Sequence, residues 1–287
     1  MNRLGARDHR VQRLRWLLRR SSVRETEHAF VAEGVRIVEA AMDAGAPVES
    51  LFVAADWRSS APVAAIVGRA SRTGLAVFEL GPGIMERVAD TVSPQSVCAV
   101  VEAVDLGLDE LLSRSGPSAE RDVVLVCVDV RDPGNLGAVL RIAGATSVSG
   151  VICCSGTVDP FNPKVVRASA GALFRVPLVT DVMPAEALGS LAALGYRCWA
   201  TVPQGGTDYA VAIRVLERVH DLLVRRPVRA RLVAVEALRA FEDGPPALLA
   251  VDCALDPGHF GAPFIINSSA ICGAAKFLVG DAKLCAG

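Results

Sequence analysis

The sequence predicts an α/β protein of two domains, the second built on a mostly parallel sheet covered by helices. The chain has 287 residues, which exceeds the usual size of one domain. Apolar residues make up 52% of it and charged residues 21%, so there is ample material for buried cores. Short apolar runs alternate with helical patterns, as is typical of parallel α/β folds.

The first hundred residues read as a small α/β unit. Helical periodicity spans 30–44 and 61–71, a short helix is expected at 85–90, and strand-like runs span 48–54, 75–80 and 97–104. The turn-forming stretch at 113–118 marks the most credible linker, within 106–122. We therefore expect domains at 1–105 and 123–287.

The segment from Arg3 to Arg24 is strongly basic, with eight arginines and one acid, Asp8. Its apolar residues, Val11, Leu14, Leu17 and Leu18, are spaced as one face of a helix. Such a helix docks by its apolar face and presents arginines outward, and we expect RNA contacts from Arg13, Arg19 and Arg20. The alternatives are an organelle transit peptide or a solvated face.

Several classes of site are disfavoured by pattern. No apolar run reaches the roughly 18 to 20 residues of a membrane span. The eight cysteines form neither a C-x-x-C pair nor a metal-ligand spacing with histidine, so no metal site is expected and they read as buried thiols of a reducing cytoplasm. The four histidines lack a nearby nucleophile, which gives no catalytic triad.

The second domain is expected to begin with the apolar run 123–130, typical of a strand buried on both faces. A second strand is predicted at 151–154 and a third at 196–201. After the first strand comes DVRDPGNLGAVLRIAGA, residues 129–145, in which a Pro/Gly loop leads into a helix. The pattern places Asn135 and Arg141 at the carboxyl edge of the sheet, where open α/β folds bind ligands.

The geometry of that passage suits a polyanion or a sugar hydroxyl. The structural alternative is that Asn135 only caps the helix and Arg141 only pairs with a surface acid. The loop lacks the G-x-G-x-x-G and G-x-x-x-x-G-K-[ST] patterns, which disfavours an ordinary dinucleotide or P-loop site.

Two passages resemble the signature motifs of the SpoU (TrmH) family of RNA ribose 2'-O-methyltransferases. NLGAVLRIAGA is similar to the first motif, and VDPFNPKVVRASAGALFRVPLV, residues 158–179, to the second. The passages FVAEGVRIVEAAMDAGAPVESLFV and VADTVSPQSVCAVVEAV resemble the substrate-binding domain that precedes the methylase domain in many members. The likeness covers roughly residues 10–209.

The resemblance implies a SPOUT-like methylase domain, knotted if the C-terminus permits, in a homodimer. The implied reaction transfers a methyl group from S-adenosylmethionine to a ribose 2'-hydroxyl of structured ribosomal or transfer RNA. By position, the catalytic residues would be Asn135 and Arg141, the cofactor would lie near Thr201, and Lys164 and Arg167 would contact phosphates.

From Ala210 onward the sequence departs from the family pattern, and residues 210–287 are atypical. The family's third motif, which lines the cofactor pocket and completes the knot, is not found there. The passage from Ala247 could trace strand, loop, strand and helix, with Asn267 near the expected motif. Two other functions therefore stay open: an RNA-binding protein with a catalytically impaired methylase-like body, and a small-molecule α/β enzyme unrelated to RNA.

Overall fold

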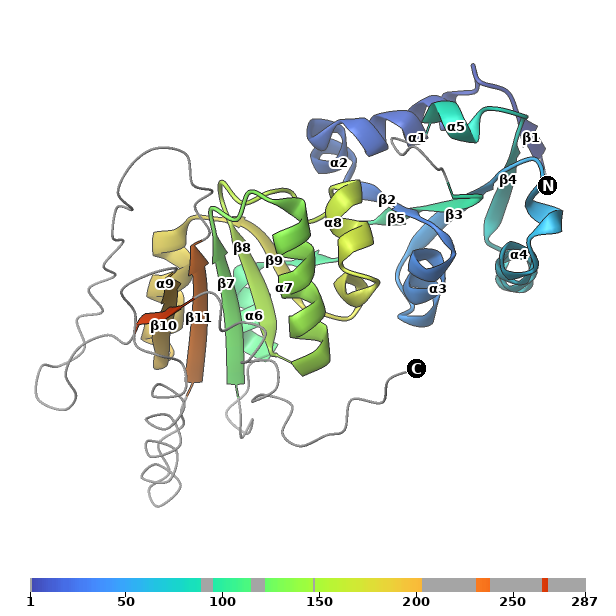
Figure 1. Ribbon diagram of the computed structural model, residues 1–287. Coiled ribbons are helices and arrows are strands. Elements are labelled where there is room, and N and C mark those ends of the chain that lie inside the picture. The colour runs from blue at the N-terminus through green and yellow to red at the C-terminus, as the bar shows by residue number, and fades with distance from the viewer. Residues whose placement is uncertain are drawn as a thin grey trace, which may run out of the picture. The chain divides into compact units, whose positions relative to one another are not determined.

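The computed structural model describes residues 2–88, 95–114, 122–146, 148–202, 231–237 and 265–267. The chain forms two compact units (Figure 1). Unit 1 comprises Met1–Val104, Leu136–Arg141 and Asp159–Arg175, and unit 2 comprises Asp105–Asn135, Ile142–Val158 and Val176–Gly287. The domain limits expected from the sequence, at residues 105 and 122, stay a prediction.

Unit 1 contains a five-stranded mixed sheet in the order β1-β4-β3-β5-β2. The strands are β1 (Asn2–Leu4), β2 (Ala29–Glu33), β3 (Val48–Val53), β4 (Ala76–Leu80) and β5 (Val97–Glu102). Strand β5 runs antiparallel to β2 and β3, whereas β4 is parallel to β1 and β3. The helices of the first hundred residues are α1 (His9–Arg19), α2 (Ser21–Glu27), α3 (Val35–Asp43), the 3-10 turn η1 (Trp57–Ser59), α4 (Ala61–Thr73) and α5 (Met85–Val88).

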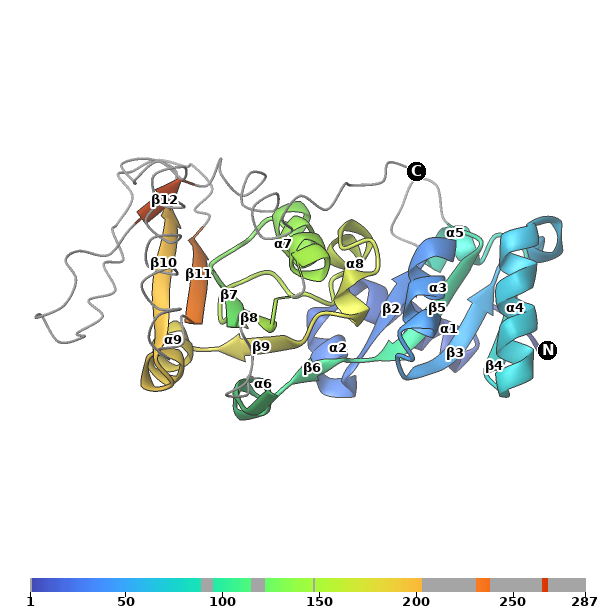
Figure 2. The same ribbon diagram turned by 90° about the horizontal axis from the view of Figure 1, so that it is seen from below.

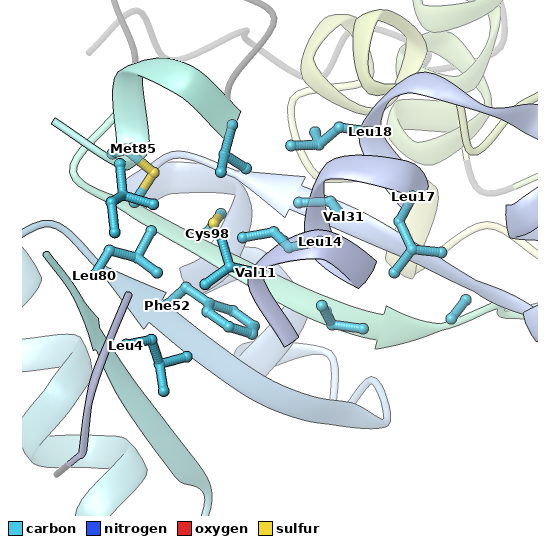
Figure 3. Close-up of a cluster of buried hydrophobic side chains, with 14 residues drawn as sticks. Leu4, Val11, Leu14, Leu17, Leu18, Val31, Phe52, Leu80, Met85 and Cys98 are labelled. Carbon is cyan, nitrogen blue, oxygen red and sulfur yellow. The ribbon is translucent and has the colours of Figure 1, made fainter. Parts of the chain in front are cut away.

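Helix α1 is confirmed, and so is its predicted apolar face. Its buried residues are Val11, Leu14, Leu17 and Leu18. Figure 3 shows these side chains in a cluster with Phe52 and Cys98 of the sheet. Because α1 supplies core residues to unit 1, this segment belongs to the fold, which disfavours the interpretation as a removable transit peptide.

The helix predicted over 30–44 is wrong in its first part. Ala29–Glu33 forms strand β2, paired antiparallel with β5, and the helix begins only at Val35. Every residue of β2 is buried, so the strand has no polar face and shows no alternation in the sequence. Gly34 separates the two elements with φ 99°, a backbone conformation that glycine adopts without strain.

The remaining elements predicted for unit 1 are confirmed within a few residues. The strands at 48–54, 75–80 and 97–104 correspond to β3, β4 and β5, and the helices at 61–71 and 85–90 correspond to α4 and α5. Helices α1 and α5 lie on one face of the sheet, whereas α3 and α4 lie on the other (Figure 1).

Asp8 caps the N-terminus of α1. Its carboxylate accepts a hydrogen bond from the backbone amide of Arg10 at 2.9 Å and two more from the Arg10 side chain. The Arg10 side-chain hydrogen bond lowers the pKa of Asp8 from 3.8 to about 2. A carboxylate with a lowered pKa stabilises the folded state above its ordinary pKa, and this contribution is lost as the pH falls through the lowered value.

We therefore expect Asp8→Ala to lower the free energy of unfolding by about 1 kcal/mol at pH 7, as measured by urea denaturation. The difference from the wild type should shrink as the pH falls from about 4 toward 2. Asp8→Asn, which keeps an oxygen acceptor at the cap, is the matched control and should lose less. Equal stability of Asp8→Ala and the wild type at pH 7 would contradict the capping role.

Unit 2 contains a seven-stranded parallel sheet in the order β12-β10-β11-β7-β8-β9-β6. Its strands are β6 (Asp105–Leu106), β7 (Asp122–Val128), β8 (Gly150–Cys154), β9 (Leu178–Val182), β10 (Tyr196–Val202), β11 (Arg231–Ala237) and β12 (Ile265–Asn267). The parallel sheet confirms the predicted fold class. The three predicted strands correspond to β7, β8 and β10, whereas β6, β9 and β11 were not predicted.

The helices associated with this sheet are α6 (Leu108–Arg114), α7 (Pro133–Thr146) and α9 (Pro184–Ala193). Leu111 of α6 and Leu188 and Leu191 of α9 share one core cluster with residues of β7, β8 and β9. Helix α7, whose two ends belong to unit 2, lies on the opposite face (Figure 2). Part of the segment predicted to be a linker, 106–122, thus forms β6 and α6.

Strands β11 and β12 come from the atypical C-terminal segment. Strand β11 lies between β7 and β10, and β12 pairs with β10 at the edge. The predicted strand and loop from Ala247 lie outside the described residues, as do 203–230, where a knot would have to be judged. Asn267 ends β12.

Four cysteines of the described residues, Cys98, Cys127, Cys153 and Cys154, are buried free thiols, as predicted. Burial raises the pKa of Cys98 and Cys154, the latter to about 12. Among the helices that the structure describes, none combines the length and apolar character that crossing a membrane needs.

Candidate active site and RNA-binding residues

Asp132 caps the helix that carries both predicted catalytic residues. Its carboxylate oxygen accepts a hydrogen bond from the backbone amide of Asn135 at 2.9 Å, and α7 begins at Pro133. The capping role that the sequence left open for Asn135 is therefore filled by Asp132. The side chain of Asn135 is exposed, and within the described residues it makes no hydrogen bond.

The loop before α7 is held by local interactions. Asp129, which follows β7, has φ 55°, a left-handed conformation that is uncommon for a residue other than glycine. Its carboxylate accepts a hydrogen bond from Nε of Arg131 at 2.8 Å. Nearby, the Val158 backbone amide donates to the carbonyl of Val130 at 2.8 Å, which ties this loop to the start of the second motif.

Arg141 is exposed on α7. Within the described part of the chain its guanidinium has neither an ion pair nor a hydrogen bond, so the alternative of a surface ion pair finds no partner there. Six residues of an α-helix correspond to about 9 Å of rise and a separation of about 120° around the axis. Asn135 and Arg141 therefore share a helix but not one face of it, and only the long arginine side chain can span that separation.

Gly137 explains how the two motifs come together within unit 1. A Cβ atom at this position would lie 2.3 Å from Cβ of Ala168 and 2.9 Å from the Ala168 carbonyl carbon. Helix α7 therefore approaches the end of α8 (Pro163–Ala168) closely, backbone against backbone. A glycine inside a helical pattern is the sequence signal of such an approach, and the sequence analysis did not use it.

The two predicted phosphate contacts of the second motif, Lys164 and Arg167, differ in whether they have a partner among the described residues. Asn162 caps α8 by accepting a hydrogen bond from the Lys164 amide at 2.9 Å, and the Lys164 side chain is exposed. Arg167, by contrast, donates through Nη1 to Oε2 of Glu33 at 3.0 Å, and Glu33 is only 4% exposed. Lys164 thus matches the predicted phosphate contact better than Arg167, which already has a carboxylate partner.

Arg24 is a buried structural cation that the sequence analysis missed. It is 5% exposed, its Nε donates to Oδ2 of Asp159 at 2.7 Å, and its Nη1 donates to the carbonyl of Leu17 at 2.7 Å. Charge clustering alone counted it with the outward-facing arginines. Aromatic rings of unit 1 lie near the second motif too, because Phe30 contacts Phe161 with ring centroids 4.8 Å apart.

The predicted RNA contacts on α1 separate into two kinds. Arg13 is half-buried and bonded to Glu49 at 2.6 Å and to Glu27, two carboxylates that raise its pKa above the ordinary value. Arg19 and Arg20 are exposed and have no ion pair within the described residues. Within the described residues, Arg7, Arg15, Arg19 and Arg20 of this segment are exposed without an ion pair, so most of its unpaired charge lies in the second half of α1 and directly after it.

Thr201 lies near the carboxyl end of β10, where the sequence placed the cofactor. It is level with Glu236 of β11, which is in turn level with Cys127 of β7. Because all three strands are parallel, the end of β10 and the loop after β7 lie at the same edge of the sheet, two strand spacings or about 10 Å apart. Residues 203–230 and 238–264, which flank β11, lie outside the described residues.

Two protein-family profiles match the chain. The SpoU rRNA Methylase family matches residues 122–224, beyond the limit near residue 209 expected from the motifs. The MRM3-like substrate binding domain matches residues 8–99.

Similar proteins are methyltransferases by name. RlmP of Bacillus subtilis, a 23S rRNA guanosine 2'-O-methyltransferase, is 28% identical over 65% of this chain and 67% of the relative. An uncharacterized tRNA/rRNA methyltransferase of Synechocystis is 31% identical over 68% of this chain and 67% of the relative. Human mitochondrial rRNA methyltransferase 3 is 27% identical over 61% of this chain. The matched part spans only 40% of the human protein.

Solved structures show the same fold. An RNA 2'-O ribose methyltransferase superposes with a TM-score of 0.65 at 23% identity, covering 96% of both chains. The rRNA methyltransferase of Sinorhizobium meliloti with bound S-adenosylmethionine (AdoMet) superposes with a TM-score of 0.63 at 21% identity, covering 86% of this chain and 92% of the other. The Synechocystis relative and the SpoU profile show that the chain belongs to the SpoU rRNA methylase family.

Proposed function

We propose that this protein transfers the methyl group of S-adenosylmethionine to the 2'-hydroxyl of a ribose in ribosomal RNA. Family membership supports the reaction, and the names of RlmP and of the human mitochondrial relative support the substrate. The observation that carries the proposal is Arg141, an exposed guanidinium on the helix of the first motif that has no ion pair within the described residues.

The strand order of unit 2 fits a nucleoside cofactor. From β7 the chain proceeds through β8 to β9 on one side, then crosses to β10 and β11 on the other. Open parallel sheets bind ligands at the carboxyl edge where the strand order reverses, and here that edge carries the ends of β7, β11 and β10. S-Adenosylmethionine supplies a sulfonium methyl group, and Thr201 would lie beside it.

The residues of α7 perform the remaining chemistry. A ribose hydroxyl is a poor nucleophile and must lose its proton as the new bond forms. The planar guanidinium of Arg141 would hold this hydroxyl by hydrogen bonds and stabilise the negative charge that develops on its oxygen. The side-chain amide of Asn135 does not cap α7, because Asp132 does, and it would orient the substrate.

Exposed cations would hold the RNA through its phosphates. Lys164, Arg19 and Arg20 are available for this role, and their contribution falls as salt rises because counterions are released on binding. Arg13 and Arg167 would have to leave carboxylate partners to take part.

Calorimetric titration with S-adenosylmethionine tests the proposal against the impaired alternative, which has no support among the relatives described above. We expect saturable binding of one S-adenosylmethionine per chain. Absence of binding heat at several temperatures, with RNA binding retained, would leave only the RNA-binding alternative.

A salt series with ribosomal RNA fragments tests the alternative of a small-molecule enzyme unrelated to RNA. RNA affinity that does not respond to salt would favour that alternative.

We further propose a homodimer in the reducing environment of the cytoplasm. The buried free thiols support the compartment, since such thiols persist under reducing conditions. Sedimentation velocity checks the dimer.

A further inference from the structure

Trp16 is exposed, whereas the other apolar residues of α1 are buried. Its relative exposure is 44%, and the other exposed large hydrophobic residues in the described part of the chain, Met183 and Leu194, are not aromatic. By helix geometry Trp16 lies about 160° around the axis from Leu14 and Leu18, away from the core-facing side. The ring therefore contributes little to the core of unit 1.

Trp57, another tryptophan of unit 1, has the burial and the hydrogen bond that are expected of a structural residue. Trp57 is 9% exposed, and its indole N–H donates to a carboxylate oxygen of Glu79 at 3.2 Å. Trp16 has no such hydrogen bond, and it contacts no aromatic ring or cation within the described residues. Its face is thus available to a partner.

Arginines without an ion pair among the described residues lie close to Trp16 in the sequence. Arg19 follows Trp16 by three residues on α1 and therefore lies beside it on the helix surface. Arg20 is the residue that caps the end of α1, and its backbone N–H donates to the carbonyl of Trp16 at 2.8 Å. Both arginines and Arg15 are exposed, with no ion pair in the described part of the chain. The other arginines of α1 are neutralised by neighbouring carboxylates, Arg10 by Asp8 and Arg13 by Glu49 and Glu27.

We propose that Trp16 is a stacking platform for an unpaired base of the RNA substrate, with Arg19 and Arg20 contacting the adjacent phosphates. An aromatic ring stacks on any base, and cations beside it follow the backbone, which is how proteins hold single-stranded nucleic acid. A protein partner would instead need a larger contiguous apolar patch than one ring surrounded by like charges. The proposal rests on the proposed function, since it concerns how the same RNA is held.

Binding to two matched RNAs tests the platform in the full chain. The first RNA is a stem-loop with an unpaired loop, and the second is the same stem closed as a continuous duplex. We expect Trp16→Ala to weaken stem-loop binding about tenfold and to leave duplex binding unchanged, whereas Trp16→Phe keeps much of the affinity. Gln12→Ala, an exposed change on the same helix, is the control and should bind both RNAs as the wild type does.

Fluorescence provides a second readout. The chain has three tryptophans, and stacking of a base should quench the one on α1. We expect stem-loop RNA to quench the wild type and to quench Trp16→Phe much less. The double variant Arg19→Ala, Arg20→Ala should weaken both RNAs and lower the slope of log K against log salt by about 1.5 in magnitude.

Equal stem-loop affinity of Trp16→Ala and the wild type would overturn the platform, even where methyl transfer proceeds normally. Dependence of stem-loop binding on Trp16 without any methyl transfer would overturn the proposed reaction and leave the platform standing. A mass in sedimentation that falls by half in Trp16→Ala, with RNA affinity unaltered, would assign Trp16 to a contact between copies of this chain and would overturn the platform as well.

Discussion

Replacing Arg141 by alanine is expected to lower the rate of methyl transfer at least about 100-fold, the usual loss when a group that stabilises developing charge is removed. The affinity for RNA should change little, because the phosphate contacts proposed here lie on α1 and α8. The fold should also be kept, since Arg141 is exposed and no carboxylate among the described residues loses its partner. Incorporation of tritiated methyl groups into ribosomal RNA measures the rate, and a filter-binding assay measures the affinity.

Two further variants sharpen this expectation. Arg141→Lys keeps the charge but loses the planar donor fork, so it should stay well below the wild-type rate if hydrogen-bond geometry matters. Arg72→Ala removes another exposed arginine, on α4, and should transfer methyl groups at the wild-type rate. A wild-type rate in Arg141→Ala would remove this residue from the reaction.

Replacing Arg24 by methionine is expected to lower the free energy of unfolding by about 3 kcal/mol, the lower end of the range for breaking a buried ion pair, since Asp159 is partly exposed. The change removes the ion-pair partner of the Asp159 carboxylate and the Arg24 donor to the Leu17 carbonyl. Urea denaturation of the full chain measures the loss.

Replacing Asp159, the partner of Arg24, as well provides the control. In the double variant Arg24→Met, Asp159→Leu no charge is left without its partner, so part of the lost stability should return. Arg20→Met, four residues earlier and exposed, should change the free energy of unfolding by less than about 0.5 kcal/mol. A loss below about 1 kcal/mol in Arg24→Met would mean that Arg24 is not a structural cation.

The sequence predicted elements best where one face of the element is polar. The apolar face of α1 was predicted residue by residue, because an amphipathic helix shows its 3.6-residue period directly. Strands β2 and β9 were missed. Strand β2 is buried on both faces, so its apolar run continued into that of α3 and read as one helix.

The roles of the arginines could be predicted only in part. Clustering shows that a segment is basic, but it does not show which charges are already paired. The partner of Arg24 is Asp159, 135 residues away, and that of Arg167 is Glu33, 134 residues away. No local pattern reveals such pairs, whereas a family motif of consecutive residues is enough to predict roles for Asn135 and Arg141.

The identity of the methylated nucleoside tests most directly whether this protein methylates the ribose 2'-hydroxyl of ribosomal RNA. Ribosomal RNA incubated with the full chain and S-adenosylmethionine is digested to nucleosides and analysed by mass spectrometry. We expect a 2'-O-methylated nucleoside that forms with the wild type and is lost with Arg141→Ala. A methyl group found only on a base, or no methylated nucleoside with any ribosomal RNA, would contradict this expectation.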